Sequence, residues 1–378
     1  MTTSRRLQEW FPWTASPAVC NGPMLGVVSP ALATEVTKAG GIGFLASVFD
    51  LSPDSPQLGK LDADLREARA LLGDADGSPV RVGVSVITGH GSVSHFAATT
   101  LPVLARHRPA AVWLFAPAED VKPHAAIVAA VREALGRPGE EQQQGTGGGG
   151  GGGGPRVFVQ VGNVAAAREA VRDGADVVVC QGVDAGGHQF TKGAGVVSLV
   201  PEVRAMLARE EEFRGREVAV LAAGGIVDEA GAAAAMALGA EGIVMGTRLT
   251  AFIQFTVAKE SIYPDFRKKI VLETVDGGAT TFKSTFNDRI NNNPLWRPPY
   301  DGRAITTAIH EKFLAGVSLE ECQRILKEEY AAEDSAKLIG TWAGTGVGLV
   351  TKPQATGDIV REVREGAKER IRSLAGSL

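Results

Sequence analysis

The fold is decided by the stretch Asp176-Val177-Val178-Val179-Cys180-Gln181-Gly182-Val183-Asp184-Ala185-Gly186-Gly187-His188. It begins with a run of valines, which is typical of a strand buried on both faces of a parallel sheet. A glycine-rich turn follows and ends in His188. Because barrel enzymes place their chemistry in the loops after the C-terminal ends of such strands, we expect this turn to lie at an active site.

Apolar runs like this one recur along the chain, separated by segments with helical spacing. The other seven begin at Ala18, Gly40, Val80, Ala110, Val157, Val218 and Gly242. Eight short strands that alternate strictly with helices favour a closed (β/α)8 barrel, the TIM barrel, over an open doubly wound sheet. We expect this barrel to occupy residues 1–250.

Two segments depart from the alternation. Residues 136–154 contain an unbroken glycine run from Gly147 to Gly154 and no apolar residue to bury, so they are predicted to form a disordered surface insertion. Residues 251–338 contain the helical stretches Ile305–Leu314 and Leu319–Tyr330 and are predicted to form a smaller, mostly helical cap. Residues 339–378 then return to the barrel through a final amphipathic helix over Ile359–Leu374.

The bulk composition excludes several classes of partner. With 39 basic and 43 acidic side chains the net charge is −4, which argues against a general nucleic-acid or anionic-membrane surface. The three cysteines lie far apart and form no metal-ligand pair, and their low, odd number favours a reducing compartment. No signal sequence or membrane span is evident, so a cytoplasmic location is expected. The sequence does not determine the oligomeric state, and a homodimer is compatible with it.

Two glycine turns follow the seventh and eighth predicted strands. They are Ala222-Ala223-Gly224-Gly225-Ile226 and Met245-Gly246-Thr247. Barrels commonly bind a phosphate at these two positions with backbone N–H groups, and glycine lets the backbone approach the anion closely. We therefore predict a phosphate site there, although a tight turn alone would also explain the glycines.

His188 is the main candidate for catalysis. It follows two glycines at the end of a strand, where a neutral imidazole could take a proton from a carbon acid near neutral pH. A structural, hydrogen-bonding histidine is the alternative. His90 also lies just past a strand end and is a weaker candidate. Asp184 could orient His188 or cap the next helix, and the sequence leaves both roles open.

Polar side chains at other strand ends could bind the ring of a ligand. They are Ser85, Gln160 and Gln181. Trp342, beside the turn Ala343-Gly344-Thr345-Gly346, could line the pocket or anchor the last helix.

These pieces resemble the nitronate monooxygenase family, also called 2-nitropropane dioxygenases. The matching motifs span most of the barrel and occur in the family's order. They are Asn21-Gly22-Pro23-Met24, Ala39-Gly40-Gly41-Ile42-Gly43, Gln181-Gly182-Val183-Asp184-Ala185-Gly186-Gly187-His188 and the two glycine turns.

The resemblance implies an FMN-dependent barrel enzyme. Its phosphate would lie on the glycine turns, the loop around Pro23 and Met24 would pass against the flavin ring, and His188 would be the base or the polar anchor near a nitro group. The residues expected to bind FMN are Asn21, Gly22, Pro23, Met24, Ser85, Gln160, Gln181, Gly182, Gly187, Gly224, Gly225, Met245, Gly246 and Thr247.

The implied reaction is the oxidation of an alkyl nitronate by O₂ to a carbonyl compound and nitrite. A base is needed only if the neutral nitroalkane is the substrate. Two alternatives stay open: a flavin-dependent enoyl-thioester reductase that uses NAD(P)H, and a flavin-free sugar-phosphate isomerase or lyase.

Overall fold

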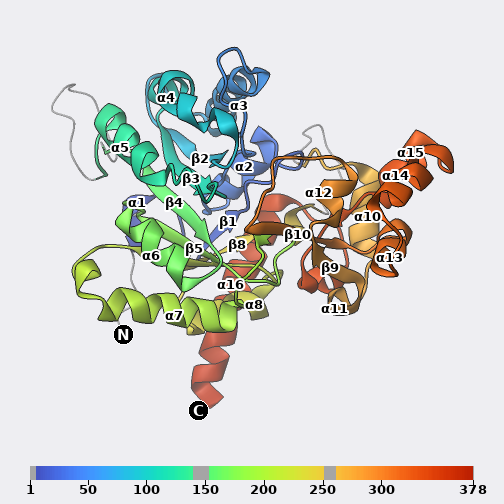
Figure 1. The fold of residues 1–378 in the computed structure, drawn as a ribbon. Coiled ribbons are helices and arrows are strands. Elements are labelled where there is room, and N and C mark those ends of the chain that lie inside the picture. The colour runs from blue at the N-terminus through green and yellow to red at the C-terminus, as the bar shows by residue number, and fades with distance from the viewer. Residues whose placement is uncertain (1–5, 139–152, 251–260, 378) are drawn as a thin grey trace.

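A computed structural model describes residues 6–138, 153–250 and 261–377 (Figure 1). Its centre is a sheet of seven parallel strands in the spatial order β1-β8-β7-β5-β4-β3-β2. The strands are β1 Ala18–Asn21, β2 Val80–Ile87, β3 Pro109–Phe115, β4 Arg156–Val161, β5 Val177–Gln181, β7 Ala219–Ala223 and β8 Gly242–Met245. Parallel order with one helix after each strand is the arrangement that the apolar runs predict.

Helices surround this sheet. They are α2 Pro30–Lys38, α3 Pro56–Leu72, α4 Phe96–His107, α5 His124–Leu135, α6 Val164–Arg172, α7 Val196–Arg209, α8 Glu229–Ala237 and α16 Thr356–Ser377. Helix α16 lies at the C-terminal end of the chain and packs against α8 and α2, so the last helix completes the ring around the barrel. A short helix, α1 Arg6–Trp10, precedes β1.

Residues 42–48 close the barrel between the two edge strands. Parallel bridges join Ile42 to Cys20 of β1 and Phe44 to Gly83 of β2. This strand, the second in chain order, is irregular because it packs tightly against α2: a Cβ at Gly43 would overlap the backbone of that helix. The predicted (β/α)8 barrel is therefore confirmed, with one strand held by isolated bridges.

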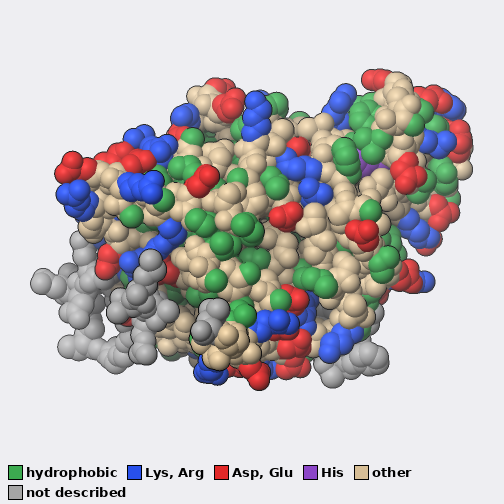
Figure 2. Space-filling view, turned by 90° about the horizontal axis from the view of Figure 1, so that it is seen from below, with side chains coloured by type: hydrophobic (Ala, Val, Ile, Leu, Met, Phe, Trp, Pro, Cys, Tyr) green, Lys and Arg blue, Asp and Glu red, His purple; other side chains and the backbone are tan. Residues whose placement is uncertain are grey.

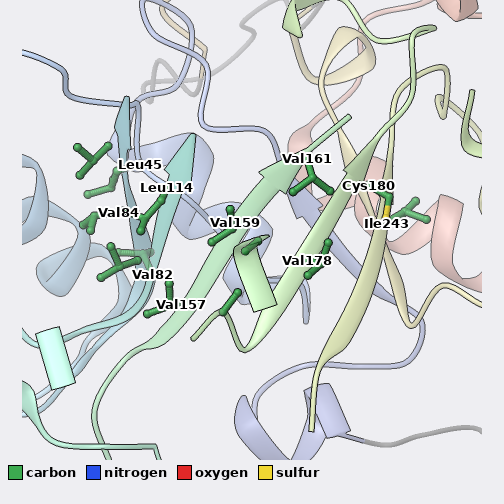
Figure 3. Close-up of a cluster of buried hydrophobic side chains, with 14 of the residues drawn as sticks. Leu45, Val82, Val84, Leu114, Val157, Val159, Val161, Val178, Cys180 and Ile243 are labelled. Atoms are coloured by element: carbon green, nitrogen blue, oxygen red, sulfur yellow. The ribbon is translucent and has the colours of Figure 1, made fainter. Parts of the chain in front are cut away.

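Alternation along the strands separates two cores. In β4, Val157, Val159 and Val161 point out toward the helices, where they join the cluster shown in Figure 3. Phe158 points into the barrel and stacks on Trp113, with ring centroids 6.0 Å apart. Successive side chains of a strand face opposite sides of the sheet. The inward-facing ones include several aromatic residues, which fill the interior below the barrel mouth.

The cap contains strands as well as helices. Its helices are α10 Asp265–Glu273, α11 Gly277–Thr280, α12 Phe286–Ile290, α13 Ala308–Leu314, α14 Leu319–Glu328 and α15 Ala332–Leu338, while the short helix α9 Thr247–Thr250 directly follows β8 of the barrel. Its antiparallel sheet consists of β6 Gly187–Phe190, β9 Thr281–Ser284, β10 Tyr300–Ile305 and β11 Thr341–Trp342. The cap lies to one side of the barrel in Figure 1.

Strand β6 changes the environment of His188. The sequence places this residue in a loop, but the structure pairs it with Gly302 of β10. The short strand leaves the barrel after the turn that follows β5 and joins the sheet of the cap. The four residues of β6 show little alternation of apolar and polar side chains, so the sequence does not predict a strand there. The pairing with β10 stabilises the strand instead.

Two predicted segments fall partly outside the described residues. The glycine insertion 136–154 includes 139–152, and the beginning of the cap includes 251–260. Among the helices that the structure describes, none is long and apolar enough to cross a membrane. Acidic and basic side chains are interspersed on the face shown in Figure 2, as expected for nearly balanced charges.

Candidate active site

A cavity of about 520 Å³ lies at the C-terminal ends of the strands and extends to the cap. Its lining combines strand ends, glycine turns and cap residues. The predicted site residues in this lining are Gly22, Pro23, Met24, Ser85, Gln160, Gln181, Gly187, His188, Gly224, Gly225, Gly246 and Thr247. The fold thus gathers at one mouth residues that are more than 200 positions apart in sequence.

Three other predicted residues lie outside the lining. Asn21 is fully buried and exchanges two 2.8 Å hydrogen bonds with the backbone of Phe44, so its amide joins β1 to the irregular strand of residues 42–48. Gly182 donates its N–H to the carbonyl oxygen of Ala223, 2.8 Å away. Met245 is fully buried and belongs to the outer core. These three residues therefore pack behind the residues that line the cavity and do not line it themselves.

The two glycine turns form one wall of the cavity, which we call the barrel wall (Gly224, Gly225, Gly246 and Thr247). Gly224 and Gly225 have φ values of +100° and +73°, which side chains with a Cβ rarely adopt. A Cβ on Gly224 would also lie 2.7 Å from the carbonyl oxygen of Gly182. The backbone therefore takes a path here that only glycine permits.

The last glycine turn holds the barrel wall in place. Gly344 donates its N–H to Oγ1 of Thr247 at 3.1 Å. Thr345 donates its hydroxyl to Oδ1 of Asp184 at 3.3 Å, and its N–H to the carbonyl oxygen of the same residue at 3.0 Å. The sequence left open whether Asp184 orients His188 or caps the next helix. In the structure it instead hydrogen-bonds the turn of residues 343–346.

Two glutamines lie above the aromatic core. Oε1 of Gln160 accepts a hydrogen bond from the indole N–H of Trp113 at 3.2 Å. The Gln181 Nε2 atom donates to the carbonyl oxygen of His188 at 3.1 Å, and its buried Oε1 has no partner in the described part of the chain. Because buried polar atoms normally have partners, this oxygen points to a ligand with a hydrogen-bond donor.

His188 forms a close pair with an acid of the cap. Its Nε2 lies 2.9 Å and 3.1 Å from the two carboxylate oxygens of Asp288, a residue of α12 that is buried. With Nε2 bonded to the carboxylate, the proton of a neutral imidazole stands on Nε2 and Nδ1 is the basic nitrogen. The pair therefore has the arrangement of a base and the acid that orients it.

Two indoles enclose the imidazole. The ring of Trp296 stacks on His188 with a centroid distance of 3.7 Å and an interplanar angle of 7°. Trp342 lies on β11 with its ring 4.6 Å away, in the space that Gly302 leaves by having no side chain. We call His188, Asp288, Trp296 and Trp342 the cap wall.

Sequence reasoning missed Asp288 and Trp296. They lie about 100 residues from His188, in a segment whose only signal was its abundance of asparagine, proline and aromatic residues. Another missed side chain is Asn287, which lines the cavity and is buried. Its Oδ1 accepts the N–H of Gly340 at 3.2 Å, whereas Nδ2 has no partner among the described residues.

The charge in the cavity is concentrated in one pair. Among the described residues that line it, none is lysine or arginine, and His188 and Asp288 are the ionisable side chains besides a phenol. That phenol is Tyr263, whose pKa is raised because burial disfavours its charged form, so it is protonated at neutral pH. An anionic group in this cavity would depend on backbone N–H groups.

Comparison with known proteins gives the family. The model of a family described as nitronate monooxygenase matches residues 152–366. A nitronate monooxygenase of Neurospora crassa is 46% identical over 374 residues, which cover 98% of this chain and 94% of that protein. The nitronate monooxygenase npaC of Metarhizium robertsii is 32% identical, with 98% and 97% covered.

The chain belongs to the nitronate monooxygenase family. It is accordingly an oxidoreductase. The predicted resemblance is confirmed, and it extends over nearly the whole chain rather than the barrel motifs alone.

Solved structures share the fold. FabK from Thermotoga maritima aligns with a TM-score of 0.68 at 23% identity, with 100% of both chains covered. The nitroalkane oxidase from Streptomyces ansochromogenes aligns with a TM-score of 0.67 at 22% identity, with 97% of this chain and 99% of that one covered. At these identities the likeness supports the barrel and its cap.

Proposed function

We propose that this protein binds FMN in the main cavity and uses O₂ to oxidise alkyl nitronates to a carbonyl compound and nitrite. The pairing of His188 with Asp288 opposite the glycine turns of the barrel wall is the observation that carries the proposal. This arrangement supports a proton acceptor on one side of the cavity and an anion cradle on the other. Membership of the family supplies the reaction class.

The residues present fit a flavin mononucleotide. Backbone N–H groups at Gly224, Gly225 and Gly246 would hold its phosphate, which suits a cavity without a lysine or arginine among its described lining residues. The buried Oε1 of Gln181, which has no partner among the described residues, would accept a hydrogen bond from the ring. When bound, FMN supplies the electron acceptor of the reaction.

The cap wall would act on the substrate. If a neutral nitroalkane enters, the basic Nδ1 of His188 removes the proton from the carbon next to the nitro group and leaves a nitronate. Asp288 holds the imidazole in the tautomer that makes Nδ1 the acceptor, and stabilises the imidazolium that results. A preformed nitronate does not need this step.

The shape of the cavity favours compact, apolar substituents. The rings of Trp296 and Trp342 lie against the base, and Leu295 lines the same cavity. Asp288 is the one carboxylate in the described lining, so it would repel a substrate whose side chain carries a second negative charge. Short alkyl nitronates satisfy both conditions.

The visible absorption spectrum of the purified protein tests the cofactor. Bands at roughly 370 and 450 nm, and release of FMN into the supernatant after heating, are expected. Oxygen uptake with ethyl nitronate, accompanied by nitrite, then tests the reaction. A colourless protein that cannot be reconstituted with FMN would contradict the proposal and favour the sugar-phosphate barrel, while rapid anaerobic flavin reduction by NADPH would favour the enoyl-thioester reductase.

A further inference from the structure

A second cavity of about 460 Å³ lies beside the first. It is enclosed by the loop after β2 and by the cap loop that precedes β10. Its lining residues are Ser52, Gly89, His90, Gly91, Ser92, His95, Pro294, Leu295 and Arg297. Leu295 lines both cavities, so the two spaces meet at this residue.

The second cavity is lined by basic side chains, unlike the first. Arg297, His90 and His95 line it, and no described lining residue is acidic. The side chain of Arg297 is exposed and, within the described residues, pairs with no carboxylate. An arginine without a partner beside two imidazoles is an arrangement that an anion would complete.

The geometry of His90 makes it a hydrogen-bond donor. Its Nδ1 accepts the backbone N–H of Ser92 at 3.3 Å and lies 2.7 Å from the hydroxyl of the same residue. The proton of a neutral ring therefore stands on Nε2, which has no partner in the described chain. Phe49 packs edge-on against this ring at 5.6 Å and fixes its plane. Nearby Asp50 accepts the N–H of Ser52 and is not part of the lining.

We propose that this second cavity binds the O–N–O anion of the reaction, either the nitronate on its way to His188 or the nitrite that leaves. The inference rests on the proposed function. Both ions present two oxygens on one nitrogen to the Arg297 guanidinium and to the Nε2–H of His90, as a carboxylate would.

Position supports this assignment. The described lining of the main cavity has no lysine or arginine, so it offers an incoming anion little attraction besides backbone N–H groups. A cationic site at the rim raises the local concentration of an anion and its rate of capture. Leu295 lines both cavities, and its neighbour in sequence, Trp296, stacks on His188.

Nitrite binding to the holoenzyme tests the site without turnover. Sodium nitrite is titrated calorimetrically at low ionic strength into the wild type, Arg297→Gln, His90→Gln and Arg209→Gln. Arg209 is an exposed arginine of α7 that lines neither cavity and serves as the matched control. We expect the first two variants to weaken binding about tenfold, as loss of a charged hydrogen bond does. No nitrite binding to the wild type, or equal binding by Arg297→Gln, would overturn the proposal.

Kinetics with ethyl nitronate and neutral nitroethane distinguish the two ions. If the nitronate is captured, Arg297→Gln lowers the ratio of kcat/KM for nitronate to that for nitroethane about tenfold and flattens its salt dependence. If nitrite is the ion, the ratio holds and product inhibition by nitrite weakens. If Arg297→Gln changes neither the kcat/KM ratio nor the product inhibition by nitrite, the assignment of this cavity to the reaction is overturned. A holoenzyme that binds nitrite through Arg297 but oxidises no nitronate would refute the proposed function alone.

Discussion

The barrel wall of the main cavity consists of backbone, whereas the cap wall consists of side chains. Gly224 and Gly225 stand on one turn after β7, and Gly246 follows the neighbouring strand β8. His188 comes from β6, and its partner Asp288 comes from a helix 100 residues later. The first wall is therefore local in sequence, and the second exists only after the cap has folded onto the barrel.

The difference between the walls separates binding from chemistry. A cradle of backbone N–H groups binds an anion without the help of side chains. It therefore depends on the path of the backbone, which a Cβ in place of a glycine hydrogen would disturb. The cap wall works through protonation and ring stacking, so it depends on the identity of each side chain. Substitutions in the two walls should consequently change different observables.

The largest effect is expected from His188→Asn. Without the imidazole, the rate of neutral nitroalkane oxidation should fall by about 10²- to 10⁴-fold, because general base catalysis contributes that much. Oxidation of preformed ethyl nitronate should be spared, as should FMN content. Steady-state oxygen uptake with the two substrates measures this. An equal fall for both would show that His188 does not abstract the proton.

Asp288→Asn should have the next largest effect. An amide cannot stabilise the imidazolium as a carboxylate does, and charge-assisted hydrogen bonds contribute about 1.5–3 kcal/mol, so nitroalkane kcat/KM should fall about 10- to 100-fold. The pH profile of kcat/KM should also shift, which a purely structural residue would not cause. Asp276→Asn, at an exposed helix cap of the same region, is the control. An unchanged pH profile would remove Asp288 from the mechanism.

Gly224→Ala tests the barrel wall. With a Cβ at this position, the left-handed φ and the contact with the Gly182 carbonyl oxygen should disfavour the native conformation of the turn by about 1–3 kcal/mol. Because FMN would bind this conformation of the turn, its affinity should fall about 5- to 100-fold. Equilibrium dialysis of FMN against reconstituted apoprotein measures this. Gly215→Ala has a similar φ of +80° and free space around the new Cβ, so it isolates the general cost of backbone strain. Equal FMN affinity in both variants would argue against a phosphate cradle.

Trp296→Leu should give the smallest effect. Loss of one stacked ring removes about 0.5–1.5 kcal/mol, so nitroalkane kcat/KM should fall about 2- to 10-fold while FMN affinity holds. Trp10→Leu removes an indole that stacks with Arg156 instead and should leave the kinetics unchanged. A loss of FMN in Trp296→Leu would show that the two walls are not independent.

Much of the barrel could be predicted from the sequence because its signals are local. Buried parallel strands are apolar runs, and glycine turns with positive φ must be glycine whatever surrounds them. The irregular strand of residues 42–48 could be expected at Gly40–Ala46, but its bridges to β1 and β2 depend on how closely it packs on α2.

The chemistry of His188 was decided by tertiary structure. The sequence alone determined that a histidine follows a buried strand at a barrel mouth, because strand and turn are contiguous. It could not determine that Asp288 orients this ring or that Trp296 covers it, because residues so far apart meet only through the pairing of β6 with β10. Local propensity carries no information about such a pairing, since its stability comes from contacts that the folded cap creates.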